Sequence, residues 1–250
     1  CTRYGAEIAA QIKSYAGRLA PDGDAMLEYL PLFLAAIVCE FIDSGIGMMY
    51  GTILAPVLII CGVDPQVAVP SILISQALGG LVATFGHHRF KNADFSIRSM
   101  DFKIGAVIYL LGVLAVFAGV LLAVKIPKQW LQLYIGVLVF LMGTVVVFKK
   151  KFKFSWRKVM AIGLLSAFNK ALSGGGYGPL VASGLIVSGR ESKSAIGTTD
   201  FAEAPICITA FFAWALMKHQ FPDPAVFVPM TLGAMIGALF GPYALSRLGS

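Results

Sequence analysis

The sequence predicts an all-α polytopic membrane protein with an inverted-topology repeat, in which two broken or re-entrant helix hairpins meet near the bilayer midplane. Composition, two glycine-rich breaks and an internal match lead to this prediction. Hydrophobic residues make up 58% of the 250-residue chain and charged residues 13%, against about 25% charged in a typical soluble domain. So few charges cannot cover a surface in water, whereas a surface facing lipid needs none.

Five segments are long enough to be uninterrupted transmembrane helices. A helix needs about 20 apolar residues to cross the hydrocarbon core. Four segments of about that length carry no charge: 66–86, 104–124, 129–148 and 225–246. A fifth, 194–217, has the length but carries Asp200 and Glu203.

Two other stretches, 30–62 and 159–189, are interrupted by glycine-rich runs. The first contains SGIGMMYG at 44–51, and the second contains SGGGYGP at 173–179. Glycine loses more entropy than other residues on entering a helix and readily adopts other backbone angles, so both helices should open there. We therefore expect two hairpins whose turns lie within the depth of the membrane.

The two broken stretches match each other without gaps at a shift of 127 residues. Identical residues then coincide in both breaks and in the turn after each: Gly47 with Gly174, Tyr50 and Gly51 with Tyr177 and Gly178, and Gly62 with Gly189. Apolar segments often match by chance, but a Tyr-Gly pair and a turn glycine in one alignment indicate an internal duplication.

The duplication divides the chain into two transmembrane repeats, 28–148 and 159–250. An N-terminal tail (1–27) precedes them, and a basic cytoplasmic linker (149–158) joins them. The second repeat shows no counterpart of the span 129–148. We expect either a truncated chain or a partner that covers the exposed face, and a second copy of the chain is one such partner.

The distribution of Lys and Arg orients the chain. If 89–103 is cytoplasmic, most basic residues lie inside, and Lys125, Lys128 and Lys218 lie outside, as the bias of basic residues toward cytoplasmic loops requires. Trp214 then falls near a membrane interface. The first repeat begins outside and the second inside, which is the architecture of many secondary transporters. We expect a multi-pass protein of the cell (inner) membrane.

Several other classes of protein are disfavoured. The net charge of +7 comes from short clusters between apolar runs, so the partner is the lipid bilayer and not a nucleic acid. The four cysteines form no CxxC pair. Three histidines are too few for a histidine-box metal enzyme, and His87 and His88 look like an interfacial pair. We therefore expect no catalytic residues, no metal site and no cofactor, and the chain is not expected to be an enzyme.

The glycine breaks favour a site for a small anion. A helix that restarts inside the membrane presents unpaired N–H groups and the positive end of its dipole, and an inverted repeat would point two such ends at one midplane site. Alternatively, the glycines only permit close packing, which suits Gly233, Gly237 and Gly241 better. The candidate ligands are Gly47, Tyr50, Gly51, Thr52, Ser75, Gln76, Lys170, Gly174, Gly175, Gly176, Tyr177, Gly178, Thr198 and Thr199. The hydroxyl groups among them, like that of Ser71, could instead bond back to their own helices.

Charged residues inside the spans are costly and usually face a cavity or a partner. The repeat places Asp43 on Lys170, and Gln76 on Glu203. Asp43 and Lys170 could form a structural ion pair. Alternatively, Lys170 is the counter-charge of the substrate, and protonation of Asp43 or Glu40 releases it. The candidates for ion coupling are, in order, Asp43, Glu40, Glu203 and Asp200.

The residues around the breaks resemble a known family. GIGMMYGTILAP at 45–56 with GVDPQVAVP at 62–70 resembles the first signature of the sulfite exporter TauE/SafE family, and SGGGYGP at 173–179 with KSAIGTT at 193–199 resembles the second. The resemblance covers roughly residues 28–248. It implies a membrane carrier for small sulfur-containing anions such as sulfite or organosulfonates.

Together these features predict a secondary transporter that exports such an anion by alternating access. The sequence shows no nucleotide-binding motif, which favours ion coupling over ATP hydrolysis. The buried carboxylates favour a proton as the coupling ion, although unwound carbonyls at the breaks could bind sodium. The alternatives are an anion channel or a carrier of a different small oxyanion or carboxylate.

Overall fold

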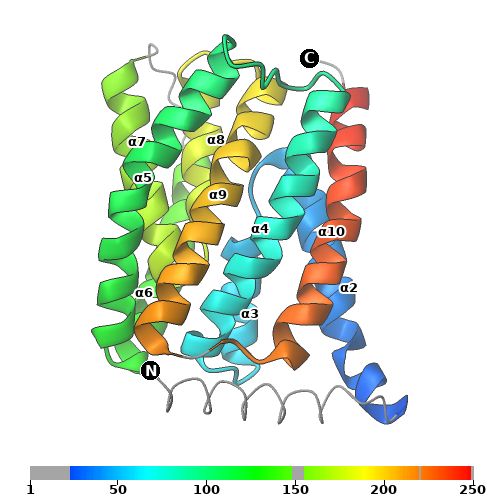
Figure 1. Ribbon diagram of the computed structural model, residues 1–250, viewed down its shortest axis with the longest axis vertical. Helices are drawn as coiled ribbons and strands as arrows, with labels where there is room; N and C mark the ends of the chain where they lie inside the picture. Colours follow the sequence, from blue (N-terminus) through cyan, green and yellow to red (C-terminus); the bar gives the residue numbers. More distant parts are fainter. Residues whose placement is uncertain (1–22, 148–154, 220, 249–250) are drawn as a thin grey trace, which may run out of the picture.

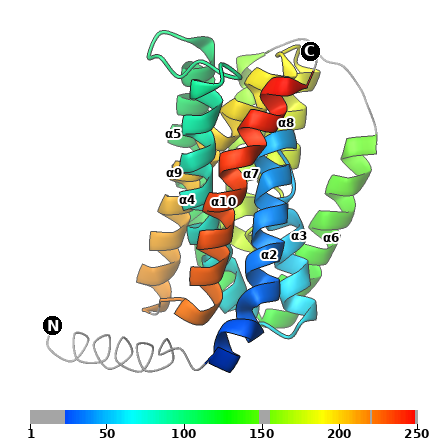
Figure 2. The same cartoon turned by 90° about the vertical axis from the view of Figure 1, so that its right-hand side faces the viewer.

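The computed structural model describes residues 23–147, 155–219 and 221–248, and within these ranges the only regular secondary structure is helical. The all-α prediction is therefore confirmed. The helices are α2 (Gly23–Ile46), α3 (Tyr50–Ile60), α4 (Pro65–Arg89), α5 (Met100–Lys125), α6 (Lys128–Val147), α7 (Trp156–Ser173), α8 (Tyr177–Val187), α9 (Ser192–Lys218) and α10 (Pro224–Arg247). They form an upright bundle (Figures 1 and 2).

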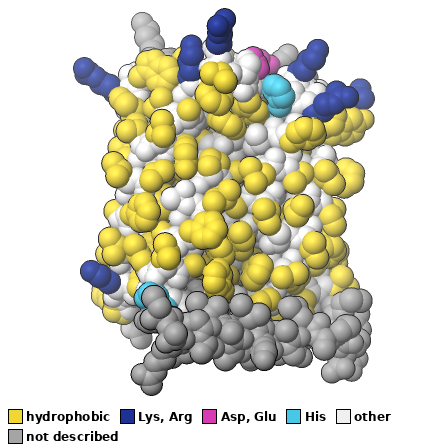
Figure 3. Space-filling view, viewed as in Figure 1, with side chains coloured by type: hydrophobic (Ala, Val, Ile, Leu, Met, Phe, Trp, Pro, Cys, Tyr) yellow, Lys and Arg dark blue, Asp and Glu magenta, His cyan; other side chains and the backbone are white. Residues whose placement is uncertain are grey.

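Five helices in the described ranges are long and apolar enough to cross a membrane: the part of α2 from Tyr29 to Ile46, and α4, α5, α9 and α10. Large apolar side chains such as Val38, Leu114 and Phe240 are exposed on the sides of the bundle. Figure 3 shows such side chains over the whole middle of one face. The chain is therefore a polytopic membrane protein.

Both glycine-rich runs break their helices. Helix α2 ends at Ile46 and α3 restarts at Tyr50, while α7 ends at Ser173 and α8 restarts at Tyr177. These bounds differ by the 127 residues of the sequence match. In Figure 1 the α2–α3 hairpin enters the bundle from the lower end, and the α7–α8 hairpin enters it from the upper end. This arrangement supports an inverted repeat.

The turns that follow the hairpins also correspond. Gly62 and Gly189 have φ angles of 89° and 90°, a left-handed conformation that favours glycine. Asp64 then caps α4 by accepting a hydrogen bond from the Gln66 N–H at 3.0 Å. Burial alone would raise the pKa of Asp64. The hydrogen bonds from Lys128 and Gln66, together with the charges of Lys128 and Lys218, outweigh burial and hold the pKa below its usual range.

Helix α10 packs closely against α2 through a stripe of glycines. A Cβ atom on Gly241 would lie 2.7 Å from the carbonyl oxygen of Phe41, and one on Gly233 would lie 2.5 Å from that of Phe33. Gly237 makes the same kind of approach to α2. These residues serve helix packing, as their spacing indicated.

The two ends of the bundle differ in charge. Helix ends and loops at one end carry most of the described basic residues: Arg89, Lys91, Arg98, Lys103, Arg157, Lys158, Arg190, Lys193 and Arg247. This end is at the top of Figure 3, and the positive-inside bias predicts that it is the cytoplasmic end.

Parts of two predicted segments lie outside the described residues, namely 1–22 of the tail and 149–154 of the linker. Helix α2 already begins at Gly23 and α7 at Trp156. Residues 23–27 and 156–158 therefore belong to helices and not to a tail or a linker.

Candidate functional site

The two helix breaks lie against each other, backbone to backbone. A Cβ atom on Gly51 would overlap the carbonyl oxygen of Gly174, and one on Gly178 would overlap the carbonyl oxygen of Gly47. The 127-residue shift exchanges these two contacts, which is the reciprocity that a two-fold relation produces. Glycine is required here because any side chain would force the breaks apart.

Further contacts join the breaks. A Cβ atom on Gly175 would lie 2.7 Å from the carbonyl oxygen of Gly51. The N–H of Gly176, whose φ is 77°, donates to Oγ1 of Thr52 at 3.2 Å. Seven candidate ligands from the sequence are thus brought together: Gly47, Gly51, Thr52, Gly174, Gly175, Gly176 and Gly178.

The two restarting helices differ at their N-termini. At α3, Oδ1 of Asp43 accepts hydrogen bonds from the N–H groups of Met49 and, at 3.2 Å, Tyr50. The protein's own carboxylate thus fills the anion position expected there. At α8 no side chain of the described residues caps the first turn. The residue equivalent to Asp43 is Lys170, which can only donate.

Four buried side chains from both repeats form a continuous chain of polar contacts. Gln76 Nε2 donates to Asp43 Oδ2 at 2.8 Å, and Gln76 Oε1 accepts from Nζ of Lys170. Lys170 Nζ lies 2.8 Å from Glu203 Oε1. The Asp43–Gln76 contact becomes the Lys170–Glu203 contact under the 127-residue shift. Lys170 therefore forms its ion pair with Glu203. The Asp43–Lys170 pair considered from the sequence is not formed, because Gln76 lies between these two side chains.

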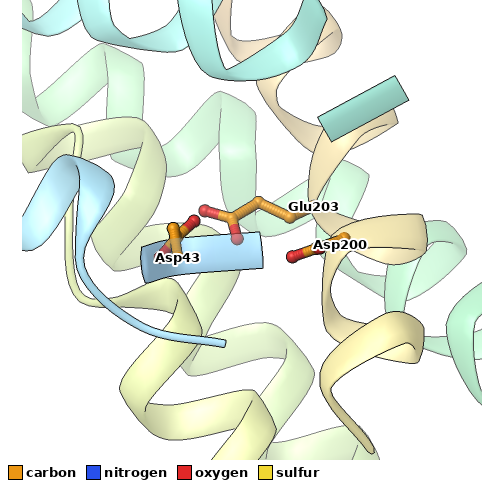
Figure 4. Close-up of side chains that lie close together, drawn as sticks. All are labelled: Asp43, Asp200 and Glu203. Carbon is orange, nitrogen blue, oxygen red and sulfur yellow. The ribbon is translucent and has the colours of Figure 1, made fainter. Parts of the chain in front are cut away.

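Three carboxylates gather at this centre (Figure 4). Ligand oxygens of Asp43, Asp200 and Glu203 lie within 4.8 Å of one another, and all three side chains are buried. Oxygens this close could in principle hold a cation. However, the chain's own donors engage each carboxylate: Gln76 and Met49 for Asp43, His87 for Asp200 and Lys170 for Glu203. We therefore assign no metal to this cluster.

Glu40 is another buried carboxylate, 1% exposed on α2. A Cβ atom on Gly79 of α4 would lie 3.0 Å from its Oε1. Its Oε2 has no hydrogen-bond partner within the described ranges. Glu40 thus lies near the centre but outside the chain of polar contacts.

The sequence analysis did not predict the contact between His87 and Asp200. His87 is fully buried, and its Nε2 lies 3.0 Å from Oδ2 of Asp200. The expectation that His87 and His88 form an interfacial pair is wrong for His87, and only His88 is exposed. The signal was Asp200 itself, because a carboxylate within a span requires a partner. Trp214, expected at an interface, is also buried and donates to the carbonyl oxygen of Ala171 at 2.8 Å.

The hydroxyl groups divide into two sets. Tyr50 OH donates to Ser75 Oγ at 2.8 Å, and Thr199 bonds back to its own helix. Tyr177 OH and Thr198 Oγ1 are buried and have no partner in the described part of the chain. Tyr177 differs from Tyr50 because Ala202 occupies the position equivalent to Ser75. These two hydroxyls are therefore available to a ligand.

Each end of the bundle has a pocket. The cytoplasmic pocket has a volume of ≈ 620 Å³, and its lining includes Lys91 and Asn92. The opposite pocket has a volume of ≈ 110 Å³, and its lining includes Trp214 and Lys218. Since the repeat shift carries Lys91 onto Lys218, the two pockets occupy related places on opposite sides of the membrane.

A multi-pass helical bundle with buried charges gathered at two helix breaks is the arrangement of a membrane transporter. The comparisons with known proteins agree with this class. Residues 32–250 match the family described as sulfite exporter TauE/SafE, and the chain belongs to this family. It is a multi-pass protein of the cell membrane, in a family of transporters.

One curated relative is the "Probable membrane transporter protein YtnM" of Bacillus subtilis (strain 168). The two are 23% identical over 186 residues, which cover 70% of this chain and 60% of the relative. The chain thus spans less than two thirds of that relative's length. No solved structure matches the chain.

Proposed function

We propose that the protein is a secondary transporter that exports a small sulfur-containing anion, such as sulfite or an organosulfonate, by alternating access. The observation that carries the proposal is Lys170, a lysine only 1% exposed, beside the contact between the two helix breaks. A buried ammonium is costly in a membrane unless it has a partner or a function. Membership of the TauE/SafE family supports a small anion as its ligand.

The anion binds between Lys170 and the start of α8. This helix begins without a capping side chain, so its first N–H groups and its dipole favour an anion. The unpartnered hydroxyls of Tyr177 and Thr198 supply further donors. The start of α3 is a poorer site because Asp43 already occupies it.

Binding is coupled to a proton through Glu203. Lys170 cannot pair fully with an anion while it is bound to Glu203. A proton on Glu203 removes the competing charge and leaves Lys170 free for the substrate. One proton and one anion then move in the same direction. Because Glu203 contacts Lys170 directly, we rank it above Asp43, Glu40 and Asp200 as the coupling group.

Alternating access requires the two breaks to separate, since they pack backbone to backbone around Gly51 and Gly174. The pockets at the two ends provide entry from opposite sides. Rocking of one repeat against the other would open the centre to each pocket in turn.

The test is flux of labelled sulfite in proteoliposomes. A carrier gives saturable counterflow, and an acidic compartment drives sulfite out of that compartment. Glu203→Gln should keep the counterflow and lose the accumulation driven by the pH gradient. Flux without saturation or counterflow would instead indicate a channel. If sulfite is not transported, the same assay with an organosulfonate or another small oxyanion identifies the substrate class.

A further inference from the structure

The two repeats differ where titratable groups connect the centre to the cytoplasmic end. His87 of α4 contacts Asp200 of α9 at 3.0 Å. The 127-residue shift carries His87 onto Trp214 and carries Leu73 onto Asp200. Neither Trp214 nor Leu73 can carry a proton. The His87–Asp200 pair on the cytoplasmic side thus corresponds to two residues on the outer side, Trp214 and Leu73, that do not titrate.

The hydrogen bonds around His87 define the positions of its protons. The amide nitrogen of Asn92 lies 3.1 Å from Nδ1 of His87 and donates to the carbonyl oxygen of Pro242 at 2.7 Å. An amide nitrogen only donates, so Nδ1 accepts and the ring N–H is on Nε2. This N–H points to Asp200. The ring therefore has an acceptor toward Asn92 and a donor toward the centre.

The contacts extend in both directions from this pair. Asn92 covers Nδ1 and also lines the ≈ 620 Å³ cytoplasmic pocket. On the other side, the Asp200 carboxylate lies within 4.8 Å of those of Glu203 and Asp43, a separation that one bridging water or a change of rotamer can close. His87 itself is fully buried.

We propose that His87 and Asp200 form a proton path that connects the cytoplasmic pocket, and not the outer pocket, to the buried carboxylates. The path rests on the proposed proton coupling and supplies Glu203 with its proton from the side on which an exported anion binds. When the Asn92 amide moves aside, a proton from pocket water binds Nδ1. The Nε2 proton then passes to Oδ2 of Asp200, which leaves the neutral ring protonated on Nδ1.

The groups around this pair favour transfer toward the centre. The ring of His87 meets one carboxylate, that of Asp200, and otherwise faces neutral groups of α2, α9 and the loop after α4. Asp200 faces further ionisable side chains, among them carboxyl groups that can accept an incoming proton. The groups concerned are Ser44, Asn92 and Gly197 for His87, and Glu40, Asp43, Tyr177 and Glu203 for Asp200.

The experiment follows protonation of Asp200 directly, without substrate. Full-length protein is reconstituted in vesicles of defined orientation, and the carboxyl C=O band is recorded by infrared spectroscopy after a jump to acidic pH on one side. Asp200→Asn identifies the band by removing it. In the wild type the band should appear promptly after a jump on the cytoplasmic side and slowly after a jump on the outer side.

His87→Gln keeps a donor near Asp200 but cannot carry a proton. It should slow the cytoplasmic response by about 100-fold, the lower end of what a positioned general acid–base group contributes. His88→Gln, at the exposed neighbouring position, should respond like the wild type. Asn92→Ala should speed the response because it uncovers Nδ1, and it provides a second test if His87→Gln does not fold.

Equal rates from the two sides, or an unchanged rate in His87→Gln, would overturn the proton path. The sulfite assay separates this result from the proposed function. If the path fails while sulfite accumulation still follows the pH gradient, another proton route serves the same transporter. If the path holds while sulfite does not accumulate, the proposed coupling to sulfite is wrong.

Discussion

At the scale of single residues, the stability of the buried centre depends on the partners of the Lys170 ammonium group. Lys170 contacts Glu203 and Gln76, and Gln76 passes the connection on to Asp43. Breaking a buried ion pair by removing one partner is strongly destabilising, because the other charge is left unpaired. A variant of Lys170 therefore needs a second substitution at its ion-pair partner, so that an effect on binding can be told apart from an effect on folding.

Lys170→Met combined with Glu203→Gln should fold but lose sulfite binding, because both charges of the pair are removed together. The measurement is the thermal shift of the purified protein on addition of sulfite, which stabilises only a protein that binds it. Lys170→Met alone should express poorly. Lys103→Met, at an exposed position on α5, is the control and should keep the wild-type shift. Equal shifts in the double variant and the wild type would rule out Lys170 as the counter-charge.

Asp43 is expected to act mainly as the cap of α3, since its carboxylate accepts from two N–H groups at the start of that helix. Asp43→Ala should destabilise the protein by about 1 kcal/mol or more, the usual cost of losing a cap. Asp43→Asn keeps one acceptor oxygen, so its melting temperature should lie between those of the wild type and Asp43→Ala. Accumulation of sulfite driven by a pH gradient should persist in Asp43→Asn, and its loss would restore Asp43 as the coupling group.

At the scale of helices, packing and breaking use glycine for different reasons. On α10, glycines allow the helix to approach α2 without interrupting it. At the ends of α2 and α7, glycines end the helices and let two backbones touch. The spacing of the glycines alone does not separate the two uses, because Gly79 and Gly80 are adjacent inside the unbroken helix α4, whereas Gly47 and Gly51 lie four residues apart at a break.

Gly51→Ala should destabilise the protein by about 1–3 kcal/mol, as insertion of a methylene into a packed interior does. The new Cβ would overlap the carbonyl oxygen of Gly174 and lie 3.0 Å from Nζ of Lys170. Both the melting temperature and sulfite counterflow should fall. Gly136→Ala is the matched control, because a Cβ there meets no atom within 4 Å. A neutral Gly51→Ala would show that the breaks are not in tight contact.

At the scale of the whole molecule, an inverted repeat is expected to place equivalent turns on opposite sides of the membrane. Cys61 lies in the turn between α3 and α4 and is exposed. The equivalent turn between α8 and α9 includes the exposed Glu191. Two halves related by an axis along the membrane normal would place both turns on one side.

A membrane-impermeant maleimide should label Cys61 from outside intact cells in a Cys1→Ser background. Glu191→Cys, made in a background that also carries Cys61→Ser, should be labelled only after the cytoplasmic side is made accessible. The buried Cys39 and Cys207 should stay unlabelled until the protein is denatured, which provides the internal control. Labelling of both positions from the same side would contradict the inverted topology.

The sequence by itself determined the class of the molecule and the positions of its helix breaks. Few charges over long apolar segments favour a membrane protein, and glycine-rich runs favour a break in a helix. The match at a shift of 127 residues also selected Asp43, Gln76, Lys170 and Glu203 as related positions. These properties are local or repetitive, so they can be read along the chain.

Only the tertiary structure decided which of these groups meet. Lys170 pairs with Glu203 and not with Asp43, because the side chain of Gln76 lies between Lys170 and Asp43. His87 turns inward to Asp200 although it lies at a helix end, since α9 packs beside α4 and leaves it fully buried. Partner choice depends on the rotation and contact of helices distant in sequence, and the spacing of residues along one chain does not contain that information.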